Sequence, residues 1–239
     1  MKQLLLKLDT DRPQTLDSFV VGQHAELVAL LQLFLLRQAG SFGERAAYIW
    51  GEHGAGKTHL LRGLTTESAV RYLNPDAALA DFEYTPEVTL YLLDDCGQLN
   101  ADQQIAAFNL YNQIKEQGGF FVGTGTLPPA LLSVREDLRT RLGWGLIYQL
   151  RDLTDQEKIA ALESAAGARG VTIPTDVLPY LITHFQRDMP ALSGMLNALI
   201  NLSLEMKRPI TLPFLREAMN KQITQQDTKE HAKTRAGNE

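Results

Sequence analysis

Residues 51–59 read Gly-Glu-His-Gly-Ala-Gly-Lys-Thr-His and match the phosphate-binding pattern G-x-x-x-x-G-K-[ST]. An apolar run of strand length, 46–50, precedes this loop, and a segment suited to a helix, 58–64, follows it. Glycines let backbone N–H groups approach a phosphate chain, and a helix N-terminus attracts the same anion. The order strand, loop, helix predicts an α/β nucleotide-binding domain. A glycine-rich turn that merely opens an ordinary helix is the alternative.

Each position of the loop has an expected role. Lys57 is predicted to reach the β- and γ-phosphates, and the Thr58 hydroxyl to ligate Mg²⁺. The expected cofactors are therefore ADP or ATP with Mg²⁺. The remaining predicted nucleotide contacts of the loop are Gly54, Ala55, Gly56 and His59.

A second motif lies at residues 88–95, which read Val-Thr-Leu-Tyr-Leu-Leu-Asp-Asp. A continuous apolar and β-branched run is typical of a buried parallel strand, and its carboxyl end is where α/β sheets bind ligands. Asp94 is predicted to hold Mg²⁺, directly or through water, and Asp95 to orient or activate the attacking water. A strand that ends in a plain Asp-Asp turn is the alternative.

Three further segments have open interpretations. At the end of the buried strand 120–126, Thr124 or Thr126 could face the γ-phosphate or simply end a strand. Val20 and Val21, before a helix expected at 24–38, could lie against an adenine ring, although core packing explains their spacing better. Arg141, before the corner 143–145 (Gly-Trp-Gly), could enter a neighbour's nucleotide site or be an ordinary solvated side chain.

Composition narrows the class of protein. The chain has 239 residues, 44% of them hydrophobic, a net charge of −5 and one cysteine, Cys96. These values are ordinary for a globular protein and exclude an intrachain disulfide framework. The most apolar stretch, 27–36, is about half as long as a membrane span and is expected to be a buried helix. We therefore expect a cytoplasmic protein with no membrane segment.

From Thr154 onward the pattern is wholly helical. Helices are expected at 155–168, 176–187, 190–207 and 212–223, with prolines at their boundaries, and residues 225–239 read as a polar, disordered tail. At the other end, Gln3-Leu4-Leu5-Leu6 precedes a polar linker. On pattern alone this apolar segment favours an edge strand over a docking peptide.

Taken together, these stretches resemble the DnaA family of AAA+ ATPases, and within it the Hda-type regulators. The matching segments are 15–22, 51–61, 92–95, 138–146 and 211–219, and the corner Arg141-Leu142-Gly143-Trp144-Gly145 is the most specific of them. The resemblance implies an AAA+ P-loop NTPase with a parallel αβα sheet followed by a small helical lid domain. The implied divisions are an N-terminal peptide and linker at 1–12, the AAA+ domain at 13–152, the lid at 153–224 and the tail at 225–239.

The resemblance also implies partners. Hda-type proteins carry a Gln-Leu-x-Leu motif that docks on the sliding clamp, the β subunit of DNA polymerase III, and Gln3, Leu4 and Leu6 match it. This match shifts our expectation for the N-terminus to a docking peptide. Arg141 takes the place of an arginine finger that promotes hydrolysis of DnaA-bound ATP in trans, which prevents re-initiation. A second copy of the chain is a further candidate partner.

Departures from the family pattern leave the chain's own ATPase activity open. DnaA continues into a helix-turn-helix domain after its lid; this chain stops, so no direct sequence-specific DNA binding is expected. Pro190 stands where the family has a sensor II arginine, with Arg187 one helical turn back as a substitute, which predicts weak reading of the γ-phosphate. Lys57 and Asp94 nevertheless suit catalysis. The competing hypotheses are an autonomous AAA+ ATPase of the helicase-loader type and a scaffold without hydrolysis.

Overall fold

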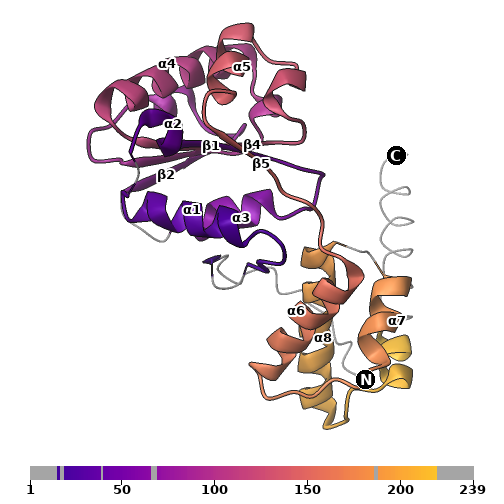
Figure 1. The fold of residues 1–239 in the computed structure, drawn as a ribbon. Helices are drawn as coiled ribbons and strands as arrows, with labels where there is room; N and C mark the ends of the chain where they lie inside the picture. The colour runs from indigo at the N-terminus through magenta and orange to yellow at the C-terminus, as the bar shows by residue number, and fades with distance from the viewer. Residues whose placement is uncertain (1–14, 17–18, 39, 66–68, 186–187, 220–239) are drawn as a thin grey trace, which may run out of the picture. The chain divides into compact units, whose positions relative to one another are not determined.

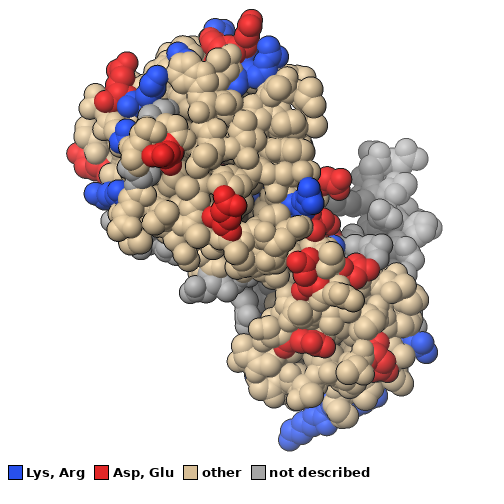
Figure 2. Space-filling model, viewed as in Figure 1, with Lys and Arg blue, Asp and Glu red and all other residues tan. Residues whose placement is uncertain are grey.

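The computed structural model describes residues 15–16, 19–38, 40–65, 69–185 and 188–219. The chain divides into two compact units, with the boundary between Leu153 and Thr154. None of the helices in the described segments has the length and apolarity needed to cross a membrane. On the face drawn in Figure 2, acidic and basic side chains are interspersed. This mixture agrees with the small net charge.

The first unit is built on a five-stranded parallel sheet. Its strands are β1 (Ala46–Trp50), β2 (Val70–Leu73), β3 (Leu90–Leu93), β4 (Phe120–Gly125) and β5 (Leu146–Gln149). They lie in the order β2-β3-β4-β1-β5, and every neighbouring pair is parallel. The P-loop strand β1 therefore lies between β4 and β5, and β3 lies between β2 and β4.

Helices cover both faces of this sheet (Figure 1). On one side are α1 (Ala25–Leu35) and α3 (Lys57–Gly63). On the other are α2 (Phe42–Arg45), α4 (Ala101–Gln117) and α5 (Glu136–Leu142), with the short helices η2 (Leu79–Phe82), η3 (Cys96–Gln98) and η4 (Pro129–Leu131) in the connections. The predicted αβα arrangement is therefore present.

The alternation of buried side chains explains the two layers. On β1, Tyr48 packs into the cluster under α4, whereas its neighbour Ile49 packs into the cluster under α1 and α3. Tyr91 and Leu92 on β3 divide in the same way. Successive strand residues point to opposite faces, so a strand that is apolar at every position must be covered on both sides.

Two glycines let the edge strand β5 approach β1 closely. A Cβ on Gly145 would lie 2.2 Å from the Ala46 carbonyl oxygen, and one on Gly51 would lie 2.1 Å from the Leu150 carbonyl oxygen. Neither position accepts a side chain without a backbone shift. The Gly-Trp-Gly corner and the first P-loop glycine are thus required at the two ends of one strand pairing.

The second unit is helical. It contains α6 (Asp155–Gly167), α7 (Val177–His184), α8 (Met189–Met206) and a last helical segment at 212–219. Thr154 caps α6 in a capping box with Glu157. Side chains from all four helices, among them Leu162, Leu181 and Phe214, form a separate buried core.

Two helices differ from their predicted form. α7 ends at His184, earlier than the predicted 187, because Phe185 adopts an extended backbone conformation. α1 is not buried all round: Leu27 and Leu31 enter the core, but Leu36 at its end is 64% exposed. The predicted helix at 27–36 is therefore present and buries one face in the core, while its outer face and its C-terminal end are exposed.

Candidate functional site

The P-loop connects β1 to α3 and has the backbone conformation that its glycines allow. Gly54 and Gly56 have φ angles of 86° and 99°, a region that strongly favours glycine. Lys57, the first residue of α3, donates from Nζ to the carbonyl oxygens of Gly51 (2.9 Å) and Glu52 (2.8 Å). Burial lowers the Lys57 pKa, although the nearby Asp95 and Asp94 act in the opposite direction. The ammonium group is therefore folded over its own loop.

Side chains from three adjacent strands meet at Asp94, directly after β3. The carboxylate is 3% exposed. Its Oδ1 accepts hydrogen bonds from Thr124 Oγ1 (2.5 Å) and the Asp95 backbone N–H (3.1 Å), and its Oδ2 accepts one from the Tyr72 hydroxyl (2.7 Å). Burial, followed by the contact with Asp94, raises the pKa of Tyr72. The tyrosine hydroxyl therefore remains a proton donor to the carboxylate at neutral pH.

Asp95 has a left-handed backbone conformation, with φ 48° and ψ 52°. Its backbone N–H also lies 3.0 Å from Thr124 Oγ1. Burial and the adjacent Asp94 raise the pKa of the Asp95 carboxyl, while Lys57 and His53 lower it. Lys57 and Asp95 thus lie close enough for each to favour the charged form of the other.

These residues fit a Mg²⁺–nucleotide site. The buried Asp94 carboxylate and the half-buried Thr58 at the start of α3 offer the hard oxygen ligands that Mg²⁺ prefers. Among the described residues, no group of three or more His, Cys, Asp or Glu side chains could hold a metal alone. A Mg²⁺ ion bound with phosphates needs no such group, because phosphate oxygens and waters complete its shell.

The segment 19–21 packs beside the P-loop helix. The Phe19 and His59 rings meet edge to face at 5.9 Å, and His59 Nε2 lies 3.3 Å from the Thr15 carbonyl oxygen. Val21 packs on the core, and Val20 is half-buried. His59 therefore contacts the chain that precedes α1, and its role as a nucleotide contact stays a prediction.

The other predicted site residues separate into two groups. Thr126 is exposed, whereas Thr124 is fully buried against Asp94. Pro190 is exposed in the first turn of α8. The second group, which lies outside the described residues, is Gln3, Leu4, Leu6 and Arg187.

Arg141 lies near the end of α5 and is held on several sides. Its Nε donates to Asn112 Oδ1 on α4 at 2.9 Å. Its guanidinium carbon lies 3.9 Å from the centre of the Trp144 ring and 5.3 Å from that of Phe108. Lys115 Nζ lies 4.4 Å from the centre of the same indole ring. The arginine is therefore restrained by one hydrogen bond and by cation–π contacts.

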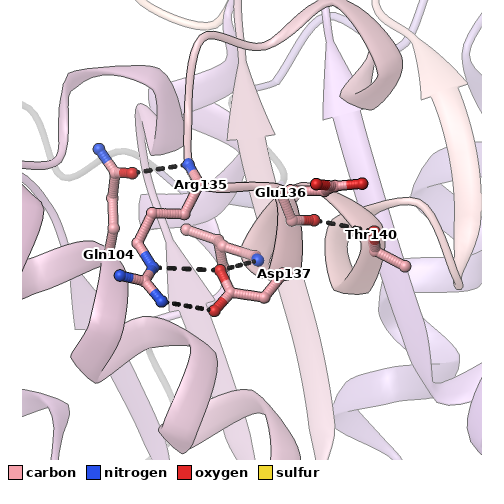
Figure 3. Close-up of polar contacts among 6 residues, drawn as sticks. Gln104, Arg135, Glu136, Asp137 and Thr140 are labelled. Carbon is pink, nitrogen blue, oxygen red and sulfur yellow. Dashed lines mark hydrogen bonds and ion pairs between the residues drawn. The ribbon is translucent and has the colours of Figure 1, made fainter.

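Arg141 also lines an open pocket of about 580 Å³ between α4 and α5. Figure 3 shows its polar rim, where the Arg135 guanidinium donates two hydrogen bonds to the Asp137 carboxylate and the Arg135 backbone N–H donates one to Gln104 Oε1. The Thr140 hydroxyl donates to the Glu136 carbonyl oxygen. The full lining is Phe108, Arg135, Glu136, Asp137, Thr140 and Arg141.

Known proteins share both units of this chain. The model of the Hda lid domain matches residues 155–219. The structure of domain III of the replication initiation protein DnaA from Thermotoga maritima superposes with a TM-score of 0.72 at 19% identity, covering 88% of this chain and 97% of that one. The chain belongs to the Hda/DnaA-related AAA+ proteins.

Two further proteins are similar to this chain over most of its length. An uncharacterized protein of Haemophilus influenzae is 33% identical over 235 residues, which cover 92% of this chain and 99% of that protein. DnaA from Aquifex aeolicus, in its AMPPCP-bound structure, matches with a TM-score of 0.69 and 20% identity over 90% of this chain and 71% of that one. At such identity the structural matches show the fold alone. The predicted AAA+ fold is confirmed.

Two residues that the sequence analysis did not single out also contact the candidate site. Tyr72 lies on β2 and Asn112 on α4, and each holds a predicted site residue by a side-chain hydrogen bond. Residues 70–73 read as a short strand, but nothing in the sequence places that strand beside β3. Nothing in the sequence pattern marks Asn112.

Proposed function

We propose that this protein is a regulatory inactivator of DnaA, which promotes hydrolysis of DnaA-bound ATP and so prevents re-initiation of replication. The Hda-type lid and the DnaA-like fold support a DnaA-related regulator. The observation that carries the finer proposal is the restrained Arg141 beside an open pocket. Arg141 lies on a surface distinct from the end of β1, where the P-loop begins.

Arg141 suits a role in trans because it is ordered and accessible at once. It is half-buried, held by Asn112 Oδ1 and stacked on Trp144, and it lines the pocket between α4 and α5. A pre-positioned guanidinium stabilises the charge that develops on a transferred phosphoryl group, and no conformational entropy is lost at that moment to order the side chain. An arginine finger of this kind contributes roughly 10³–10⁵ in rate.

The chain's own P-loop binds ADP or ATP in this proposal. Lys57 and Thr58 bind the phosphates and the metal, and Asp94 holds the Mg²⁺ shell; the ion supplies charge neutralisation when bound. DnaA structures with AMPPCP support a nucleotide at the equivalent fold position. Exposed Pro190 offers no charge to a γ-phosphate, which favours ADP as the resident nucleotide.

The N-terminal residues Gln3, Leu4 and Leu6 are proposed to dock on the β-subunit sliding clamp. A short apolar motif ahead of a polar linker suits capture in a hydrophobic pocket. Docking on DNA-loaded clamp would confine the activity to replicating DNA in the cytoplasm, and thereby couple inactivation of DnaA to elongation.

Single-turnover hydrolysis tests this proposal. Labelled ATP is preloaded on DnaA, and the protein is added with or without DNA-loaded clamp, together with a variant carrying Gln3→Ala and Leu4→Ala. We expect clamp-dependent stimulation that the double variant loses. Stimulation that needs no clamp would remove the docking proposal, and absence of stimulation would remove the inactivator proposal.

The second candidate is an autonomous AAA+ ATPase of the helicase-loader type. One observation favours it: the charge of Lys57 acts on Asp95, next to the buried Asp94–Thr124 pair, and these residue types suit hydrolysis. Steady-state ATP turnover by the protein alone, abolished by Lys57→Ala and unaffected by DnaA, would select this function.

A further inference from the structure

Tyr72, Asp94 and Thr124 come from three neighbouring strands at one edge of the sheet. β2 pairs with β3 so that Tyr72 lies beside Leu92, and β3 pairs with β4 so that Leu93 lies beside Gly123. The Asp94 backbone N–H continues the ladder by donating to the Leu73 carbonyl oxygen at 2.8 Å. The sheet register therefore fixes Asp94 between two hydroxyl-bearing side chains.

The two carboxylate oxygens of Asp94 are held unequally. Oδ1 has two partners, Thr124 Oγ1 and the Asp95 backbone N–H, both from the strand end itself. Among the described residues, Oδ2 accepts a hydrogen bond from the Tyr72 hydroxyl at 2.7 Å. Because Asp94 is only 3% exposed, its carboxylate has little contact with solvent, and the hydroxyl occupies one of the acceptor directions of Oδ2.

The Tyr72 ring is itself fixed. It is half-buried, packs against the core under α1 and α3, and has the Arg62 guanidinium 5.7 Å from its ring centre. A ring anchored in this way keeps its hydroxyl on Oδ2 rather than turning into solvent. The fixed ring therefore maintains the hydrogen bond to Asp94, the carboxylate that would hold the metal.

We propose that Tyr72 limits the Mg²⁺ affinity of the nucleotide site by competing with the ion's water shell for Asp94 Oδ2. This inference rests on the proposed nucleotide binding. Mg²⁺ requires near-octahedral geometry and gives up its waters reluctantly, so an occupied carboxylate oxygen weakens its binding. Thr124 acts in the opposite sense, because its bond to Oδ1 orients the carboxylate without covering Oδ2.

The test measures Mg²⁺ dependence of binding rather than hydrolysis. Binding of a fluorescent methylanthraniloyl ADP is titrated with Mg²⁺ for the unmodified protein and for Tyr72→Phe. Removal of one hydrogen bond to a charged group should lower the half-maximal Mg²⁺ concentration roughly three- to tenfold. Affinity for the same nucleotide in EDTA should stay unchanged, because the phosphate contacts are untouched.

Two further variants keep the result interpretable. Tyr148→Phe removes a strand tyrosine hydroxyl that faces Glu26, away from Asp94, and should leave the Mg²⁺ titration unchanged. Thr124→Val removes the bond that orients Oδ1 and should raise the half-maximal Mg²⁺ concentration. Thermal unfolding of each variant verifies that it is folded.

The outcomes separate this inference from the function on which it rests. If folded Tyr72→Phe has an unchanged or higher half-maximal Mg²⁺ concentration, this inference fails, whereas the proposed function is unaffected. Equal shifts in Tyr72→Phe and Tyr148→Phe overturn it as well, because the effect would then not depend on Asp94. If the unmodified protein binds no methylanthraniloyl ADP, the proposed nucleotide site and this inference both fail.

Discussion

Arg141 on α5 and Asn112 on α4 are joined by a hydrogen bond of 2.9 Å from the guanidinium Nε to the amide oxygen. The bond uses the nitrogen nearest the side-chain stem and leaves the two terminal nitrogens of the fork for other acceptors. Asn112 thus holds the base of the guanidinium of an arginine that also lines the pocket. This geometry assigns Asn112 the role of a positioning residue.

Loss of that contact should weaken the stimulation of DnaA without abolishing it. Asn112→Ala removes one hydrogen bond to a charged group, and we expect stimulation to fall roughly three- to tenfold. Single-turnover hydrolysis on DnaA measures the effect. Asn109→Ala, an exposed change on the same helix, is the matched control. Equal losses in both variants would show a general effect of α4 and contradict the positioning role.

Arg141→Ala should have a far larger effect, since it removes the charge itself. We expect loss of roughly 10³–10⁵ in the stimulated rate, with nucleotide and clamp binding intact. Arg141→Lys should restore little, because an ammonium group keeps the charge but lacks the planar fork that bonds Asn112 and stacks on Trp144.

The neighbouring Arg139 provides the control for Arg141. It lies on the same helix, and its side chain forms no hydrogen bond or ion pair with the described residues, so Arg139→Ala should keep nearly full stimulation. Loss of clamp binding in Arg141→Ala, or an equal loss of stimulation in Arg139→Ala, would count against the assigned finger.

Sequence alone predicted the features that depend on local pattern. The P-loop, the acidic end of β3 and the change to helices at Thr154 all follow from short runs of residues, and the fold they imply is confirmed. Strand ends were less certain: β3 starts at Leu90 because the Val88 backbone N–H is used in a turn with Thr85.

The contacts that complete the site depend on lateral order instead. Tyr72 reaches Asp94 only because β2 is the neighbour of β3, and Asn112 reaches Arg141 only because α4 packs on α5. No residue spacing along the chain encodes these neighbours. The same order explains why Thr124 rather than Thr126 bonds Asp94, since only Thr124 lies on β4 beside the end of β3.

Asp95→Asn should stabilise the folded protein at neutral pH. Burial and Asp94 raise the Asp95 pKa in the folded state, so the native protein binds this proton more tightly than the unfolded chain. The free energy of unfolding therefore falls as pH rises from the ordinary aspartate range through the raised folded pKa. Asparagine cannot ionise, so the free energy of unfolding does not fall in this way. It also tolerates the left-handed backbone at this position.

Urea unfolding at a series of pH values measures the Asp95 effect. The advantage of Asp95→Asn should grow as pH rises through that window and stay constant above it. Asp137→Asn is a control of opposite sign, because the exposed Arg135 contact lowers the Asp137 pKa. The small stabilisation by the unmodified Asp137 carboxylate is present above the ordinary aspartate pKa and is lost as pH falls through the lowered folded pKa. An advantage of Asp95→Asn that does not vary with pH would contradict the electrostatic explanation.

The Gly-Trp-Gly corner offers a test of close packing with a control two residues away. Gly145→Ala would place a Cβ 2.2 Å from the Ala46 carbonyl oxygen, and backbone on both sides must move. At Gly143 the φ angle is −83° and the nearest atom to an added Cβ lies at 3.5 Å, so alanine fits there. We expect Gly145→Ala to lower the free energy of unfolding by about 1–3 kcal/mol or more. Gly143→Ala should leave it unchanged or raise it by up to about 1 kcal/mol.

Thermal and urea unfolding of both glycine variants measure this difference, with about 2–4 °C of Tm expected per kcal/mol for a chain of this size. Because Gly145 joins the Arg141-bearing helix to β5, the shift should be accompanied by weaker stimulation of DnaA even below the Tm. Gly143→Ala should keep stimulation, since Arg141 retains its bond to Asn112 there. Equal stability of the two variants would mean that β5 can move away from β1 at little cost, and the close pairing at Ala46 would then not explain the second glycine of the corner.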